Sequence, residues 1–187
     1  MIAAPPRRVR DRLASTILAA LHDAGARETL VCLARGEAAA SGWLLPGEER
    51  LAEVVTTRAR MATAALAGRP LAPASGSLAE TLDAAAALFD ACLYFEVHEL
   101  LEPAWQGAAG EPREALQGLI QVAVGYQHLA NGNLDGGRAL LVEGASRLVA
   151  RRAVTVDVEP FARAVLAAAA GGSPERASVP RFPRASA

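Results

Sequence analysis

The sequence predicts an all-α protein, a compact helical bundle of six or seven helices with a central antiparallel hairpin. Two observations carry this prediction. Apolar residues recur, in segment after segment, with the period of about 3.6 residues that is typical of amphipathic helices. No segment shows the apolar–polar alternation of a strand. Hydrophobic residues make up 52% of the 187 residues and aromatic residues only 4%, so the core is expected to consist of Ala, Leu and Val.

The N-terminal part is expected to contain two amphipathic helices and one ambiguous segment. Helical spacing of apolar residues predicts helices over residues 8–23 and 48–67, and Gly25 is expected to end the first of them. Residues 28–35 fit either a strand or a helix, and a helix is favoured. The basic first turn of the first helix is expected to face solvent.

The C-terminal part is expected to contain five helices. Ser77 and Glu80 form a capping box, which predicts that a helix begins at Leu78. The residues alone leave open whether this helix continues past Cys92 or turns there. Pro160 falls in the first turn of the last helix, where proline is tolerated. The helices expected in this part cover residues 78–89, 94–105, 114–130, 136–151 and 159–170.

Composition divides the chain into three parts. Residues 68–76, GRPLAPASG, combine Gly, Pro and Ser as a linker does. Residues 1–76 are therefore expected to form an N-terminal helical extension and linker, and residues 77–170 a helical core domain. Residues 171–187 are rich in Pro, Ser and Arg and are expected to be disordered.

Charge and hydropathy exclude some classes of partner. The formal net charge is −1, which argues against a nucleic-acid-binding protein. No apolar run approaches the roughly 20 residues of a membrane span, so no membrane partner is expected. Residues 1–10 lack the hydrophobic core of a signal peptide, which predicts a cytoplasmic location. Cys32 and Cys92 do not have the spacing of metal ligands.

On a helix over residues 94–105, a His and a Glu share one face with aromatic residues. An aromatic face predicts a core position, and a His and a Glu there need partners because an unpaired buried charge is costly. Glu99 lies on the flank of this face and Glu96 on the opposite side. At about 100° per residue, an arc of about 120° holds Tyr94, Phe95, His98, Leu101, Glu102 and Trp105.

The helix over residues 114–130 supplies candidate partners. Gln117, Gln121 and His128 align on one stripe, which Gly118 and Gly125 flank. Glycine is unfavourable inside a helix, by about 1 kcal/mol, so these two predict a close neighbouring helix. The short turn before this helix favours the preceding helix as that neighbour. We therefore expect His98 and Glu102 to meet Gln121 or His128.

These residues resemble a known family. The runs YFEVHELLEPAW and LQGLIQVAVGYQHLANGN, followed by residues 136–141, are similar to the domain of unknown function family 309, which consists of small helical bacterial and archaeal proteins. Its members share a His-Glu-x-x-Glu run ending in Trp and a Gln-Gly-x-x-Gln helix. The resemblance covers about Leu82–Leu148, roughly a third of the chain. One departure is Cys92, where members often have glycine. The resemblance implies a helical fold, and the family has no established activity to carry over.

The favoured interpretation of the polar residues is a buried structural network that fixes helix register in a small interaction or oligomeric module. The amides suit this role because an amide both donates and accepts hydrogen bonds. A homodimer through a helix face is the partner expected for such a module. The network comprises His98, Glu102, Gln117, Gln121 and His128, flanked by Tyr94, Glu99 and Trp105.

The alternative is a metal-dependent or acid–base hydrolase-like enzyme. His98, Glu102 and His128 are its candidate catalytic residues and its candidate ligands for a divalent metal. The His-Glu-x-x-His motif of zinc peptidases is broken here, because Glu102 stands at the second ligand position. The sequence identifies no cofactor and no small-molecule ligand. An open pocket along the polar stripe would favour this alternative, and a sealed stripe would favour the structural network.

Overall fold

The computed structural model describes residues 5–149, 151–153, 156–171 and 179–184. These residues form eight α-helices, a 3-10 turn and a two-residue antiparallel strand pair, so the all-α prediction is confirmed with one helix more than the six or seven expected. The elements are α1 (Arg7–Ala19), α2 (Ala24–Ala34), η1 (Glu49–Leu51), α3 (Ala52–Leu66), α4 (Leu78–Asp90), α5 (Tyr94–Gly107), α6 (Gly110–Ala130), α7 (Leu134–Leu148), β1 (Arg152–Ala153), β2 (Val156–Asp157) and α8 (Glu159–Ala170).

The first helix ends earlier than the sequence predicts. Gly25 was expected to end it, but α1 stops at Ala19 and Gly25 lies in the first turn of α2. The cause is Asp23, whose carboxylate accepts a hydrogen bond from the backbone N–H of Ala26 at 2.7 Å and so caps a new helix. The segment 28–35, which fits either a strand or a helix by its sequence, therefore lies almost entirely in α2.

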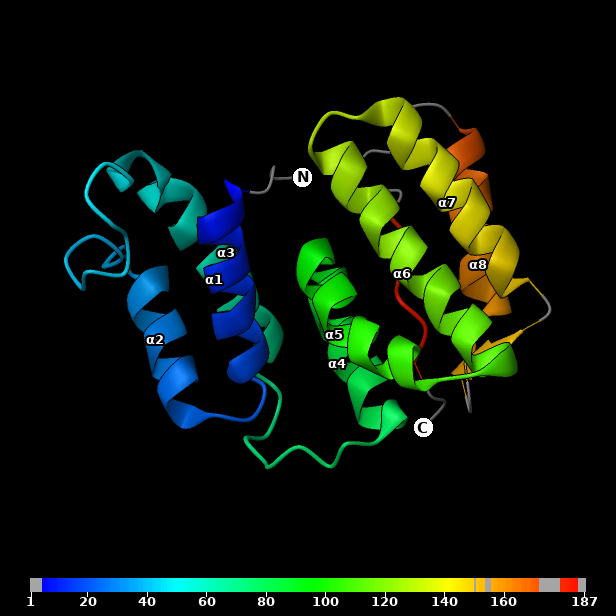
Figure 1. Ribbon diagram of the computed structural model, residues 1–187, viewed down its shortest axis with the longest axis horizontal. Helices are drawn as coiled ribbons and strands as arrows, with labels where there is room; N and C mark the ends of the chain where they lie inside the picture. Colours follow the sequence, from blue (N-terminus) through cyan, green and yellow to red (C-terminus); the bar gives the residue numbers. More distant parts are fainter. Residues whose placement is uncertain (1–4, 150, 154–155, 172–178, 185–187) are drawn as a thin grey trace.

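The helices are arranged in three groups, which Figure 1 shows side by side. Helices α1, α2 and α3 lie on one side, α6, α7 and α8 lie on the other, and α4 and α5 stand between them. Helices α5 and α6 are joined by a short turn, and α6 and α7 run antiparallel. One cluster of buried apolar residues extends through all three groups.

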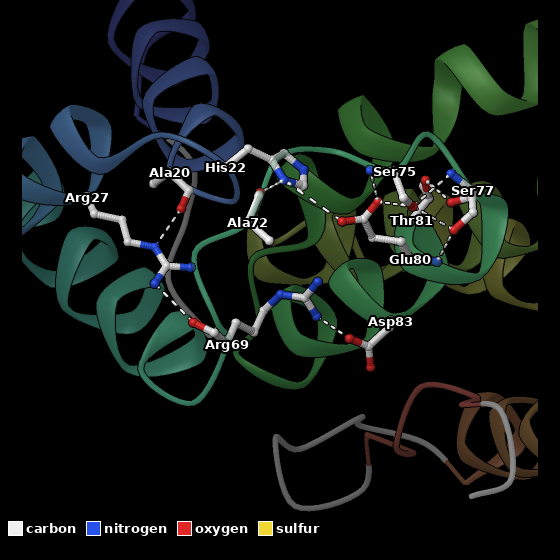
Figure 2. Close-up of polar contacts among 10 residues, drawn as sticks. All are labelled: Ala20, His22, Arg27, Arg69, Ala72, Ser75, Ser77, Glu80, Thr81 and Asp83. Atoms are coloured by element: carbon white, nitrogen blue, oxygen red, sulfur yellow. Dashed lines mark hydrogen bonds and ion pairs between the residues drawn. The ribbon is translucent and has the colours of Figure 1, made fainter.

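The segment between α3 and α4 is held against the N-terminal helices (Figure 2). The Nδ1 atom of His22 lies 3.0 Å from the carbonyl oxygen of Ala72. Arg27 donates from Nε to the carbonyl oxygen of Ala20 at 2.8 Å and from Nη1 to that of Arg69 at 3.0 Å. The predicted linker thus follows a defined path along α1 and α2.

The same segment is also held at the start of α4, where only the Ser77 half of the predicted capping box forms and the carboxylate of Glu80 bonds Ser75 instead of the backbone N–H of Ser77. Ser77 accepts a hydrogen bond from the backbone N–H of Glu80 at 3.2 Å. The carboxylate of Glu80 accepts from the hydroxyl of Ser75 at 2.5 Å and from its backbone N–H at 2.7 Å, and these bonds hold the pKa of Glu80 below its ordinary value. Arg69 forms an ion pair with Asp83.

Helix α5 begins after a sharp turn at Cys92. Cys92 has φ of +61°, a left-handed conformation that side chains other than glycine rarely adopt. Helix α4 ends at Asp90 and α5 begins at Tyr94. The question that the sequence leaves open is therefore answered: the chain turns at Cys92.

The glycines of α6 face α7 and not α5, which corrects the expected neighbour. A Cβ atom added to Gly118 would lie 2.8 Å from the carbonyl oxygen of Gly144, and one added to Gly125 would lie 3.1 Å from that of Gly137. Both partners lie on α7 and, like those on α6, are seven residues apart. The short turn brings α5 beside α6, but the backbones approach most closely at the seam between α6 and α7.

A buried ion pair joins α3 to α5. Arg58 donates from Nη2 to both carboxylate oxygens of Glu96, at 3.0 and 2.8 Å. Both side chains are 1% exposed. Glu96 does point away from the polar face of α5, as its helical position predicts, but it enters the core beside α3.

Part of the C-terminal tail packs on the core. Phe182 is 2% exposed, and its ring centroid lies 5.1 Å from that of Phe89 and 5.5 Å from that of Phe161. Its backbone N–H donates to Asp90 at 3.0 Å. The prediction that residues 171–187 are disordered is therefore wrong for residues 179–184, because an aromatic residue outweighs the polar composition around it. Residues 172–178 and 185–187 lie outside the described residues.

Candidate functional site

Helices α5 and α6 form an open groove along the predicted polar stripe. Its lining includes His98 and Glu102 from α5 and Gln117 and Gln121 from α6, and Trp105 and Ile120 complete it. Its volume is about 210 Å³. We call it the α5–α6 groove. The antiparallel hairpin thus places two polar residues of each helix around the same space.

The polar side chains are not buried, contrary to the expectation of a sealed network. His98 is 30% exposed and Glu102 is 39% exposed, and Gln117, Gln121 and His128 are likewise partly exposed. The physical reason is the orientation of α6. Gly118 and Gly125 face α7, where the two backbones approach closely. The side of α6 that faces α5 carries larger side chains, which keep these two helices apart and leave the groove between them.

Within α5, His98 lies between two carboxylates. Its Nδ1 atom is 3.1 Å from Oε1 of Glu99, and its Nε2 atom is 3.7 Å from Oε2 of Glu102. The other oxygen of Glu102 accepts a hydrogen bond from Gln106 at 3.3 Å. Glu99, predicted to stand on the flank, is therefore a direct neighbour of the imidazole.

Gln121 presents an unpaired oxygen beside this groove. Its Nε2 atom donates to Glu143 at 2.8 Å. An ionised carboxylate only accepts, so this bond fixes the amide orientation. A hydrogen bond from Gln121, and a second, smaller contribution from the hydrogen bond of Arg147, hold the pKa of Glu143 below its ordinary value. The Oε1 atom of Gln121 is buried and has no hydrogen-bond partner among the described residues.

Trp105 lines the same groove. Its indole Nε1 is buried without a hydrogen-bond partner in the part of the chain that the structure describes. The guanidinium of Arg113 lies 4.2 Å from the centroid of the indole ring, in a cation–π contact that orients the ring. A buried donor without a partner and a buried acceptor without a partner each cost free energy.

His128 faces a different space from Glu102. It lines a second pocket of about 310 Å³ together with His98, Tyr94 and Phe95, and its Nδ1 atom lies 2.9 Å from Nδ2 of Asn133. His98 lines both spaces. The structure therefore brings His128 close to His98 but not into the α5–α6 groove.

One group of three side chains within the described residues has the arrangement of metal ligands. His98, Glu99 and Glu102 each offer one ligand atom, and these atoms lie within 4.8 Å of one another. His128, which the sequence suggested as a ligand, is not a member of this group. The donor set is one imidazole nitrogen and two carboxylate oxygens, all on α5.

Residues 82–140 match the family model described as Domain of unknown function (DUF309). The predicted resemblance is confirmed over this segment, which runs from α4 into α7. No curated protein and no solved structure matches the chain significantly. No helix in the described part of the chain is long and apolar enough to cross a membrane.

The DUF309 segment contains the whole α5–α6 groove but not the whole second pocket. Arg10 of α1 also lines that pocket, although the basic first turn of this helix was expected to face solvent. Gln127 and Asn131, which sequence reasoning also missed, line it as well. Gln127 stands next to His128 in the sequence, which was a usable signal, whereas nothing in the sequence indicates that Arg10 packs against α5.

Proposed function

We propose that the α5–α6 groove binds a divalent metal ion, with His98 and Glu102 as ligands. The observation that carries this proposal is the proximity of the side-chain donor atoms of His98, Glu99 and Glu102, of which His98 and Glu102 line an open groove. A structural network would be sealed, whereas this stripe is accessible. A bound metal holds nitrogen and oxygen ligands at about 2.0–2.2 Å, and the partly exposed carboxylates can rotate to reach that distance.

The two carboxylates have different roles in this proposal. Nε2 of His98 faces Glu102, and this pair stands one turn apart on the same side of α5. Nδ1 faces Glu99 at 3.1 Å. A histidine that binds a metal through one nitrogen commonly donates its other N–H to a carboxylate, which fixes the tautomer and the ring orientation. Glu99 is the orienting carboxylate.

Gln121 supports the proposal from the other helix. Gln121 lines the same groove, and Glu143 holds its amide in one orientation, in which the carbonyl oxygen has no hydrogen-bond partner among the described residues. A mixed set of imidazole, carboxylate and carbonyl donors suits Zn²⁺, Fe²⁺ or Mn²⁺. When bound, such an ion would polarise water or a carbonyl or phosphoryl oxygen of a substrate in the groove.

Equilibrium dialysis with Zn²⁺ and with Mn²⁺, followed by elemental analysis, tests this proposal. Wild-type protein should retain about one ion per chain. The variants His98→Ala and Glu102→Gln should lose it, and Glu99→Gln should weaken binding by about 10–100-fold, as expected for an orienting carboxylate. Glu53→Gln, an exposed carboxylate on α3, is the matched control and should bind as the wild type does. Equal metal content in all four variants would contradict the proposal.

An interaction module is a second candidate, favoured by exposed apolar residues of α7. Leu134, Val142 and Val149 lie at the start, in the middle and at the C-cap of that helix and are 51, 47 and 38% exposed. Large apolar side chains left in solvent are a feature of contact surfaces. Sedimentation equilibrium should then show a dimer that Val142→Glu dissociates. A monomer at all concentrations would remove this candidate and leave the metal proposal untouched.

A further inference from the structure

The second pocket lies between α1, α5 and α6 and extends beyond the proposed metal site. Its volume of about 310 Å³ is at the lower end of the range of small-molecule sites, about 300–1,000 Å³. Its apolar wall consists of Tyr94, Phe95 and Val124, and polar side chains complete it. Because Arg10 is among these, we call it the Arg10 pocket. The pocket combines an apolar surface with a few convergent polar groups, which is the general composition of a ligand site.

Arg10 is held in a fixed position at this pocket. Its guanidinium carbon lies 4.1 Å from the centroid of the Phe95 ring, a cation–π contact between α1 and α5. Its Nε and Nη2 atoms donate to one oxygen of Asp11 at 2.9 and 2.7 Å. Nη1 donates to no other side chain within the described residues. A guanidinium oriented in this way is suited to hold a carboxylate, because less conformational entropy is lost on binding.

His128 supplies a second donor, and its tautomer follows from its neighbours. Oδ1 of Asn133 accepts the backbone N–H of Gly136 at 3.1 Å, so Nδ2 is the atom that lies 2.9 Å from Nδ1 of His128. An amide N–H₂ only donates, and therefore Nδ1 of His128 accepts. The proton of the neutral imidazole is then on Nε2, which is the remaining donor of this pocket-lining side chain.

Gln127 adds an unsatisfied group in the wall of the same pocket. It is 7% exposed, and its Nε2 atom donates to Asn131 at 3.1 Å. The other atom of its amide, Oε1, has no hydrogen-bond partner in the described segments. Because this amide oxygen only accepts, a ligand carboxylate cannot pair with it, and a carboxylate in this pocket must lie on the side of Arg10 and His128.

From these observations we infer that the Arg10 pocket binds a small organic carboxylate with an apolar body. Arg10 and the Nε2–H of His128 hold the carboxylate, and Phe95, Tyr94 and Val124 contact the apolar part. The N-terminal helix, which lies outside the DUF309 match, thereby contributes the group that recognises the charge. The inference does not require a bound metal.

The test is a ligand-observed NMR titration of the full chain after metal removal, with benzoate as the probe and benzamide as its neutral isostere. Benzoate should bind, and benzamide should bind about 10-fold more weakly, since a charge-assisted contact of about 1.4 kcal/mol is lost. Arg10→Gln should weaken benzoate binding by a similar factor. Arg163→Gln, on α8 and 71% exposed, is the control and should leave it unchanged.

Three results would overturn the inference: no binding of benzoate at millimolar concentration, equal binding of benzoate and benzamide, or equal benzoate affinity of Arg10→Gln and wild type. If Arg10→Gln does not fold, chemical-shift perturbation of the wild type decides instead. The amides of Phe95, Gln127 and His128 should then shift most, and a response confined to other residues would contradict the site. Glu102→Gln should keep its affinity for benzoate, so this experiment and the metal titration can fail separately.

Discussion

Arg58 and Glu96 illustrate how one side chain inside the core depends on another. Both are 1% exposed, and two of the guanidinium nitrogens of Arg58, Nε and Nη1, are buried without a hydrogen-bond partner among the described residues. A buried ion pair offsets its desolvation penalty only while both charges are present. The pair therefore links α3, which precedes the segment matched by the family model, to α5, which lies inside it.

Removing one charge should be more harmful than removing both. Glu96→Ala should lower the free energy of unfolding by about 3–5 kcal/mol, because it leaves Arg58 buried and unpaired. The double variant Arg58→Met, Glu96→Leu should lose much less. Urea unfolding followed by circular dichroism measures both. A single variant as stable as the wild type would show that Arg58 reaches water when its partner is lost.

Glu80 should make the attachment of the linker depend on pH. Its hydrogen bonds to Ser75 hold its folded-state pKa below the ordinary value near 4.5. A depressed pKa means that the stabilisation is present above the unfolded-state pKa and is lost as the pH falls through the folded-state pKa. Glu80→Gln should therefore lower the melting temperature at pH 7, and the difference from wild type should disappear in acid. A difference that persists unchanged at pH 3 would contradict this account.

At the residue level, the sequence predicts some positions well and others not at all. His98 and Glu102 could be identified as site candidates because polar residues on an aromatic helix face are unusual. Gln121 could be identified because it lies on the same helical stripe as Gln117 and His128. Their burial could not be predicted, since it depends on how α6 is rotated about its own axis. Arg10 could not be found, because its contact with Phe95 joins residues 85 positions apart.

The close contact between α6 and α7 could be predicted in part from the sequence. Glycines recur seven residues apart on both helices, at Gly118 and Gly125 and at Gly137 and Gly144. Small residues indicate that some backbone approaches closely, but they do not identify which one. The adjacent helix α5 was the expected neighbour, and α7 is the observed one.

A methyl group placed in this seam should separate the helices. Gly118→Ala should destabilise the protein by about 1–3 kcal/mol, because the new Cβ would lie 2.8 Å from the carbonyl oxygen of Gly144, which is backbone and cannot rotate away. Gly107→Ala is the control, since nothing lies within 4 Å of its added Cβ. Thermal unfolding compares the two. Equal melting temperatures would mean that α6 and α7 can move apart without loss.

Helix boundaries were predictable where a cap or a proline marks them. The capping box at Ser77 and the early Pro160 place the starts of α4 and α8 correctly. The break between α1 and α2 was missed, because Asp23 was read as the last residue of one helix and not as the cap of the next. The strand pair of two residues on each side is too short to produce an alternation.

On the scale of the whole molecule, the C-terminal segment closes the core beside the DUF309 helices. Phe182 packs against Phe89 of α4 and Phe161 of α8, and Arg181 and Arg184 lie 3.3 and 2.8 Å from the carboxylate of Asp90. The composition of this segment predicts disorder, because it contains one aromatic residue among polar ones. The packing of Phe182 depends on the positions of Phe89 and Phe161 in the folded chain, which composition does not reveal.

Truncation of this aromatic side chain tests whether the segment contributes to stability. Phe182→Ala should lower the free energy of unfolding by about 3–5 kcal/mol, the usual effect of removing a buried phenyl ring. Differential scanning calorimetry should show a single transition at lower temperature. An unchanged transition would mean that residues 179–184 separate from the core without affecting it.

The central claim is that His98 and Glu102 hold a divalent metal in the α5–α6 groove. X-ray absorption spectroscopy of the zinc-loaded protein tests it most directly, because the scattering pattern reports the ligand atoms themselves. The account predicts one imidazole together with oxygen ligands at about 2.0–2.2 Å, and loss of the imidazole signal in His98→Ala. A sulfur shell at about 2.3 Å, which would implicate Cys32 or Cys92, or a shell with no imidazole, would contradict it.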